Sequence, residues 1–314
     1  MANPILTAKH FQDEEAAFAY VEAALWPEGP HCPHCGGVER ISKMQGKSTR
    51  VGLYKCYQCR KPFTVRIGTI FESSHVALHL WLQAIHLICS SKKGISANQL
   101  HRTLGVTLKT AWFLGHRIRE AMRDGSMSPM GGEGQTVEID ETVFGKLEGA
   151  PKDASFRGSN FRNIALTLVE RGGRARSFHV DSASIADLKP VIRANVAREA
   201  AIMTDEWKAY REIGREFASH DTVTHSKEEY VRREGDKVVT TNTVEGFYSI
   251  FKRGMKGVYQ HCKERHLHRY LAEFDFRYSN RVRLGVNDTA RADRALLGVK
   301  GKRLTYRTAH SAEA

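Results

Sequence analysis

The sequence predicts a multidomain protein of mixed α and β structure, with a small cysteine-rich part, a helical part and a larger part containing strands and helices. Three observations support this. Two Cys-x2-Cys pairs lie near the N-terminus, apolar residues recur at helical spacing between residues 78 and 122, and alternating strand patterns begin at residue 136. A chain of 314 residues with 41% hydrophobic content has enough length and apolar side chains for two or three cores.

The net charge of the chain points to a polyanionic partner. Lys and Arg number 48 against 35 Asp and Glu, which gives a net charge of +13. Such an excess favours nucleic acid, and less often an anionic membrane surface. We find no run of 18 apolar residues and no signal-peptide pattern at the N-terminus, so we expect neither a transmembrane helix nor secretion.

Two cysteine pairs predict a structural metal site in residues 1–71. Cys32 and Cys35 form the first pair, and Cys56 and Cys59 form the second, 20 residues further on. Each pair fits a tight turn that points both sulfurs at one ion, and four thiolates suit tetrahedral zinc. Four cysteines leave no open coordination position, so the zinc is structural; a redox pair is the alternative. We expect a helix at 13–24 and ribbon strands at 51–55 and 63–67.

Residues 72–130 are predicted to be helical. Residues 78–89 form an apolar helix that is too short to span a membrane. Ser96 is placed to cap a helix that ends at Gly105, and Thr107 is placed to cap a second helix over 108–122. A plain linker at 126–134 follows and marks a domain boundary.

The second of these helices is the candidate DNA-reading element. Two helices joined by a short glycine-containing turn, with basic residues on the second, form the pattern of a helix-turn-helix. We therefore expect Lys109, Thr110 and Arg117 to contact DNA, with the start of the second helix in the major groove. A helical hairpin without DNA contact is the alternative.

The order of elements in residues 136–283 predicts the fold of the largest domain. Strands at 136–145, 163–169 and 175–180 form an antiparallel meander, a helix follows at 184–196, and a fourth strand at 201–204 precedes a helix at 241–253. Three strands, a helix, a further strand and more helices is the order of the RNase H-like fold, an α/β domain with a mixed five-stranded sheet.

Carboxylates in this domain predict a metal site. Asp140 lies within the first strand, where an aspartate is unusual unless the strand is solvated on one face or the carboxylate has a charged partner. The first and fourth strands are neighbours in this order, so Asp140 and Asp205 can meet, with Glu245 as a third acid. Three carboxylates at one point repel unless divalent cations separate them, and oxygen ligands suit Mg²⁺ or Mn²⁺. We therefore expect two-metal phosphoryl transfer.

Several blocks together resemble one protein family. These are the cysteine ribbon, the helix-turn-helix, Val-Glu-Ile-Asp140-Glu-Thr, Met-Thr-Asp205-Glu-Trp and the block from Asn242 to Gly254. From about residue 10 to 283 the chain resembles bacterial insertion-sequence transposases of the ISXO-like, zinc-ribbon group. The resemblance implies a DDE-type enzyme that nicks the terminal inverted repeats of a transposon and joins their 3′-hydroxyls to target DNA. It also implies at least a dimer on double-stranded DNA, in the cytoplasm at the nucleoid.

The third ligand stays open at this point. Some members of the group use Asn where others use Glu, and Asn242 and Glu245 are both present, one helical turn apart. Charge favours Glu245, with Asn242 as the alternative or as its partner. Lys252 lies two turns beyond Glu245 and is expected to hold a DNA phosphate, unless it is simply solvated. Arg253 is expected to contact DNA.

Other residues near the predicted site have less specific expectations. Glu138 shares a strand face with Asp140 and is expected to be a salt-bridge partner, with metal binding as the alternative, whereas Glu141 points to the opposite face. His225 is expected at the surface, with help in positioning DNA as the alternative. Residues 261–283 are predicted to form a basic amphipathic helix, and 284–314 a weakly structured basic tail with a short helix at 290–297.

Two other functions fit the same motifs. A DNA-binding regulator would keep the ribbon and the helix-turn-helix and carry an inactive last domain. A stand-alone metal-dependent nuclease would keep the metal site and lack strand transfer. The presence of Asp140, Asp205 and Glu245 argues against the regulator.

Overall fold

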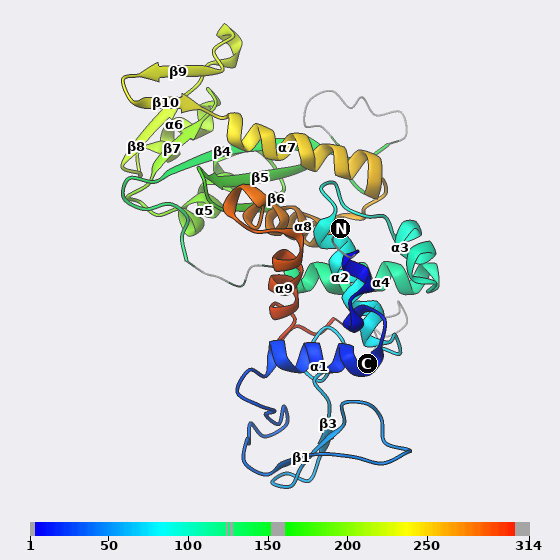
Figure 1. Cartoon of the computed structure of the whole chain (residues 1–314). Helices are drawn as coiled ribbons and strands as arrows, with labels where there is room; N and C mark the ends of the chain where they lie inside the picture. Colours follow the sequence, from blue (N-terminus) through cyan, green and yellow to red (C-terminus); the bar gives the residue numbers. More distant parts are fainter. Residues whose placement is uncertain (1–3, 124, 126–127, 152–160, 305–314) are drawn as a thin grey trace. The chain divides into compact units, whose positions relative to one another are not determined.

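The structure, a computed structural model, describes residues 4–123, 125, 128–151 and 161–304. The chain forms two compact units (Figure 1). The first unit contains the chain up to Ser91, Ile95–Met122 and the segment from Asp288 onward, and the second contains Lys92–Gly94 and Arg123–Asn287. The end of the chain therefore returns to the unit in which the chain began. In the described residues, no helix is long and apolar enough to cross a membrane.

The zinc-ribbon fold in the first unit is small. Its three strands form an antiparallel sheet, β1 (Ile41–Lys43), β2 (Tyr54–Cys56) and β3 (Pro62–Phe63). The strands were predicted to be longer, and β1 was not predicted. Trp26, Tyr54 and Phe63 pack their rings together, with centroids 5.5–5.9 Å apart. This aromatic cluster is the main apolar contact within the ribbon.

Helices form the rest of the first unit. α1 (Glu14–Leu25) begins where Asp13 accepts a hydrogen bond from the Ala16 amide at 2.8 Å, and α2 (Leu78–Ser90) is largely buried. α9 (Asp288–Leu297) packs on α1, α2 and α4, and the buried Arg291 donates to the Cys89 carbonyl oxygen at 2.9 Å. The short helix expected at 290–297 is therefore present, but it is part of a core, which corrects the expectation that residues 288–297 belong to a weakly structured tail.

The two helices of the predicted helix-turn-helix have the predicted limits. α3 (Ala97–Leu104) begins where Ser96 Oγ accepts from the Gln99 amide at 3.1 Å, and it ends at Gly105, whose φ of 66° lies in the left-handed region. α4 (Leu108–Met122) begins where Thr107 Oγ1 accepts from the Thr110 amide at 3.1 Å. Local capping chemistry explains why these boundaries were readable from the sequence.

The second unit is built on a mixed sheet in the order β6-β5-β4-β7-β8, as predicted for an RNase H-like domain. β4 and β6 are antiparallel to β5, β7 is parallel to β4, and β8 is parallel to β7. The strands are β4 (Thr136–Phe144), β5 (Asn163–Glu170), β6 (Ala175–Val180), β7 (Ala201–Thr204) and β8 (Ser219–Thr222).

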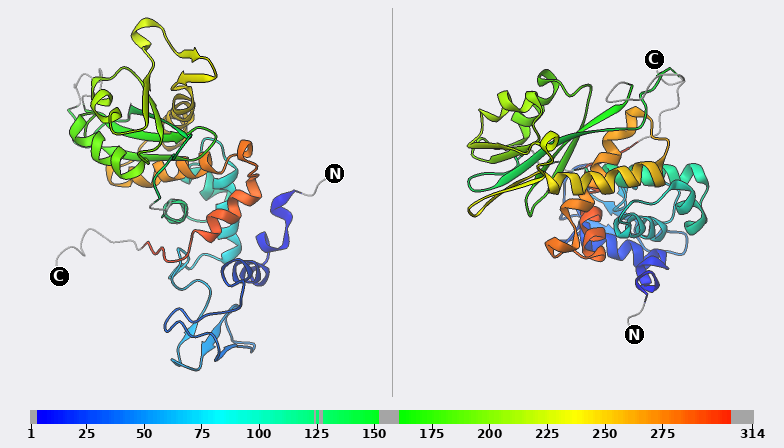
Figure 2. Two further views of the ribbon diagram at one scale, coloured as in Figure 1. Left: turned by 90° about the vertical axis from the view of Figure 1, so that its left-hand side faces the viewer. Right: turned by 90° about the horizontal axis from the view of Figure 1, so that it is seen from above.

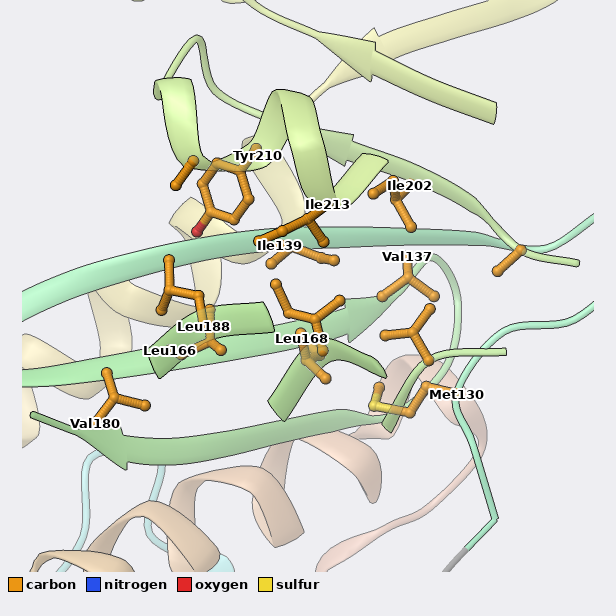
Figure 3. Packing of buried hydrophobic residues seen from close by; sticks show 14 of the residues in the cluster. Met130, Val137, Ile139, Leu166, Leu168, Val180, Leu188, Ile202, Tyr210 and Ile213 are labelled. Atoms are coloured by element: carbon orange, nitrogen blue, oxygen red, sulfur yellow. The ribbon is translucent and has the colours of Figure 1, made fainter. Parts of the chain in front are cut away.

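Helices cover both faces of this sheet (Figure 2). On one face, α5 (Ile185–Asn195) and α6 (Lys208–Gly214) pack on odd-numbered β4 residues such as Val137 and Ile139 (Figure 3). On the other, α7 (Asn242–Gly254) and α8 (Leu267–Ser279) pack on Phe144 and on β5 and β6. The even-numbered residues of β4, Asp140 among them, therefore face α7.

A β-hairpin precedes α7 and was not predicted. It consists of β9 (Val231–Glu234) and β10 (Lys237–Thr240), and Thr240 leads directly into Thr241 at the start of α7. The remaining short helical turns are η1 (Ile5–Thr7), η2 (Lys9–Phe11), η3 (His225–Lys227), η5 (Glu264–His266) and η6 (Val282–Leu284), with a π-helical turn η4 (Met255–Tyr259) after α7.

The predicted linker contributes to the core of the second unit. Met130 is fully buried, and its backbone N–H donates a hydrogen bond of 2.6 Å to the carbonyl oxygen of Asn195, at the end of α5. The second unit therefore begins before the linker ends.

Candidate active site

The four cysteines of the ribbon come together as a metal site. All four sulfurs lie within 4.8 Å of one another, with Cys32 Sγ 3.6 Å from Cys59 Sγ and Cys35 Sγ 3.7 Å from Cys56 Sγ. A tetrahedral zinc ion about 2.3 Å from each sulfur requires sulfur–sulfur distances of about 3.8 Å. The site therefore has the size that zinc needs, and the zinc-ribbon prediction is confirmed.

The pairing of β4 with β7 aligns the two aspartates. Val137 lies opposite Ile202 and Glu138 lies opposite Met203, so each β4 residue pairs with the residue 65 positions further along the chain. Continued by two residues, the same register puts Asp140 level with Asp205, which directly follows β7. The topology thus places both carboxylates on neighbouring strands at one end of the sheet.

Asp140 lies in an environment that opposes its ionised form. Burial raises the pKa of Asp140 well above its usual value, and the charges of Glu141, Asp205 and Glu245 raise the pKa further. Burial also raises the pKa of Asp205, while a hydrogen bond of 2.9 Å from the Trp207 amide favours its charged form. An ionised pair of this kind requires nearby positive charge to be stable at neutral pH.

Glu245 lies in the first turn of α7, close enough for its charge to affect Asp140. Its Oε1 accepts a hydrogen bond of 2.8 Å from Thr241 Oγ1, and its side chain is 42% exposed. Asn242 is the first residue of the same helix and is exposed. In the described part of the chain, the three carboxylates do not approach one another as closely as the four cysteine sulfurs do.

A buried ion pair fixes the start of α7 next to Asp140. Glu138 is fully buried, and its carboxylate accepts hydrogen bonds from the amides of Thr243 at 2.7 Å and Val244 at 3.1 Å. Arg171 Nε pairs with the same carboxylate at 2.7 Å and also donates to the backbone carbonyls of Val238 and Thr240. A carboxylate at a helix N-terminus satisfies unpaired amides and complements the helix dipole. Glu138 is therefore a salt-bridge partner, as predicted, and it also caps α7; the sequence indicated neither Arg171 nor the cap.

Replacing Glu138 by Ala is expected to lower the free energy of unfolding of the second unit by about 3–5 kcal/mol. The change would leave Arg171 and the α7 amides without their partner, and removing one member of a buried ion pair carries a cost of this size. Glu138→Gln should cost less because its amide oxygen can still accept from the helix. Chemical denaturation would measure both, with the exposed Glu199→Ala as the control; equal stability of Glu138→Ala and Glu199→Ala would exclude this role.

Two further residues take positions that bear on the site. Glu141 faces away from Asp140, as predicted, and accepts a hydrogen bond from the hydroxyl of Tyr210 in α6. Tyr248 in α7 is buried and donates to the Asp140 carbonyl oxygen at 2.5 Å. These contacts hold β4 between α6 and α7 at the position of Asp140. Lys252 and Arg253 lie further along α7 and are exposed, with Arg253 Nε 2.9 Å from the Ser249 carbonyl oxygen.

One of the three expected DNA contacts on α4 is corrected. Arg117 is only 3% exposed, and its guanidinium donates to the carbonyl oxygens of Ile70 at 2.6 Å, Glu72 at 2.9 Å and Leu304 at 3.0 Å. It is therefore a structural residue that ties α4 to its surroundings, and it is too buried to contact a phosphate. Lys109 is exposed at the start of α4, and Thr110 is half-buried.

The second unit is an RNase H-like domain, and a zinc ribbon stands before it in the same chain; together they define a nucleic-acid-processing protein. Residues 131–279 match the ISXO2-like transposase domain, and residues 12–62 match the transposase zinc-ribbon domain. The two matches cover more than half of the chain, which belongs to the ISXO2-like transposases of insertion sequences. It is 27% identical over 287 residues to an uncharacterized protein in transposable element ISH50 of Halobacterium salinarum, an alignment that covers 87% of this chain and 93% of the relative.

Proposed function

We propose that this transposase cleaves transposon ends and joins them to target DNA by two-metal phosphoryl transfer at Asp140, Asp205 and Glu245. The observation that carries the proposal is the parallel register of β4 and β7, which brings two half-buried aspartates level at one end of the sheet. Buried acids without compensation are costly, and the residues around them supply more negative charge. This donor set of carboxylate oxygens fits Mg²⁺ or Mn²⁺.

The proposed roles of the residues are metal binding, positioning of Glu245 and DNA contact. Asp140, Asp205 and Glu245 would hold two divalent ions, and such ions would supply activation of a water or a 3′-hydroxyl and stabilisation of the leaving oxygen. Glu138 and Arg171 keep the first turn of α7, and so Glu245, at a fixed place beside β4. Lys252 and Arg253 extend the exposed side of α7 with positive charge, which suits DNA phosphates near the site.

DNA recognition is assigned to the first unit. The exposed start of α4, with Lys109 and Thr110, is the surface that would enter the major groove, as the second helix of a helix-turn-helix does. The ribbon is also basic, with lysines and arginines between residues 40 and 66. We propose binding to double-stranded terminal inverted repeats by at least a dimer, since two ends must be held together for joining.

The test is an assay of cleavage and joining with a labelled duplex that carries the terminal inverted repeat and a target plasmid. With Mg²⁺ or Mn²⁺ the protein is expected to nick the end and transfer it to the plasmid, and EDTA should stop both steps. Binding without cleavage in either metal would favour the regulator. Cleavage without joining, with pre-cleaved ends also inert, would favour the nuclease.

The third ligand is decided by a pair of substitutions on α7. Glu245→Gln removes the charge and keeps the shape, so we expect a loss of cleavage of about 100-fold or more, because metal contacts supply several kcal/mol to the transition state. Asn242→Ala should keep most of the activity, since Asn242 is exposed and Glu245 carries the charge that reaches Asp140. Cleavage rates at saturating metal would measure both. The reverse pattern would assign the third position to Asn242.

A further inference from the structure

We propose that His225 is a positioning residue that holds Glu245 in place within the active site. The inference rests on the proposed function, since it concerns the third carboxylate of the same site. His225 begins the short turn η3, in the segment between β8 and the β9–β10 hairpin. From the sequence, His225 is expected at the surface of a basic stretch, with help in positioning DNA as the alternative.

The turn that carries His225 is anchored beside Asp205. The carboxylate of Glu206, the residue after Asp205, accepts hydrogen bonds from the backbone amides of His225 at 2.7 Å and Ser226 at 3.0 Å. A second carboxylate, that of Glu229, accepts from the Thr224 amide at 3.1 Å. The backbone on both sides of His225 is therefore fixed by acids that do not take part in the proposed chemistry.

The imidazole of His225 reaches from this turn to the start of α7. Its Nε2 lies 3.4 Å from Glu245 Oε1 and 3.4 Å from Thr241 Oγ1, and Thr241 Oγ1 in turn donates to Glu245 Oε1 at 2.8 Å. The imidazole nitrogen, the hydroxyl and the carboxylate oxygen form a closed triangle. His225 thus links the turn next to Asp205 with Glu245, through a contact of 3.4 Å to the Glu245 carboxylate.

This contact has a consequence for metal binding. Glu245 has a long side chain, and restricting its free rotation costs conformational entropy. An imidazole and a hydroxyl that already hold Oε1 restrict part of that rotation before a metal arrives. The carboxylate would then need less further ordering when a metal binds. Groups that orient a ligand in this way commonly change metal affinity or activity by about 10–100-fold when removed.

The test compares three substitutions at this position. Gln places its amide nitrogen near the position of Nε2, Asn places its amide nitrogen near Nδ1, and Ala removes both. Cleavage of the end duplex is measured against Mn²⁺ concentration. We expect His225→Ala to raise the half-saturating concentration of Mn²⁺ by about 10-fold or more. In His225→Gln this concentration should return most of the way to the wild-type value, whereas in His225→Asn it should stay high. His261→Ala, an exposed histidine of the same unit, is the control.

Thermal unfolding of each variant separates positioning from folding. Gln and Asn are similar in size and polarity, so a folding defect would affect both, whereas the proposed contact distinguishes them. A wild-type Mn²⁺ dependence in His225→Ala would overturn the inference, and so would rescue by Asn in place of Gln. Both results leave the proposed function standing as long as Asp140→Asn is inactive. Full activity of Asp140→Asn would instead overturn the function itself.

Discussion

Replacing Asp140 by Asn is expected to abolish cleavage and joining, with a loss of at least about 10³-fold, while binding to the transposon end is kept. Asn has nearly the same shape but lacks the negative charge with which the carboxylate would hold a divalent cation, and a loss of about 4 kcal/mol in transition-state stabilisation corresponds to this factor. Asp205→Asn should behave in the same way. Gel assays of nicking and strand transfer would measure the loss, and an electrophoretic shift would measure binding.

The same substitution should not weaken the metal-free fold. Burial and three neighbouring acids already raise the pKa of Asp140, so the ionised carboxylate is a source of strain there. Asp140→Asn is therefore expected to unfold at the same temperature as the wild type or at a higher one without metal, and to gain less stability when Mn²⁺ is added. Glu141→Gln is the matched control, because Glu141 is the neighbouring acid on the other face and bonds to Tyr210. Loss of activity in Glu141→Gln with full activity in Asp140→Asn would remove Asp140 from the site.

The position of Asp140 was predictable because it depends on the order of elements. Three strands, a helix and a strand place β4 beside β7 in this fold, and each aspartate is local to one of those strands. Helix limits such as Ser96 and Gly105 were predictable for a similar reason, since caps are set by neighbouring residues. Where an element is fixed by contacts between neighbouring residues, its limits could be predicted from the sequence.

Contacts between distant segments were not predictable. Glu138 was placed on the correct face, but its role as the cap of α7 depends on a partner 105 residues away. The strand β8 and the β9–β10 hairpin were not predicted, because each of these strands has only four residues and most of those residues are polar. Without the hairpin, no argument could place the turn of His225 next to α7.

Arg117 shows a different kind of limit. Its basic side chain on a predicted recognition helix indicated a DNA contact, yet it lies three residues after Leu114 and four before Ala121, both buried. Helical spacing therefore puts Arg117 on the buried stripe of α4. For Arg117, the position on the helix predicts burial correctly, whereas the charge of the side chain predicts a DNA contact that the structure does not support.

The second large effect is expected at the ribbon, where Cys32→Ser should release the zinc and unfold β1–β3. The ribbon strands are two or three residues long, and three aromatic rings form its main apolar contact. Such a small core cannot offset the entropy of ordering the loops, whereas zinc binding in small domains contributes about 10–16 kcal/mol of apparent free energy. Serine is a poor zinc ligand, so three sulfurs should not retain the ion with comparable affinity.

Metal analysis of the purified protein should find about one zinc per chain in the wild type and in Cys262→Ser, and much less in Cys32→Ser. Trp26 contacts Tyr54 and Phe63 of the ribbon, so its fluorescence should change when a strong chelator removes the ion. Cleavage of the end duplex should fall with end binding, because the ribbon is assigned to recognition and the carboxylates to chemistry. If Cys32→Ser keeps its zinc, or if chelation leaves the ribbon folded, then the four sulfurs do not hold a structural ion. Loss of zinc without any loss of end binding would assign recognition to α4 alone.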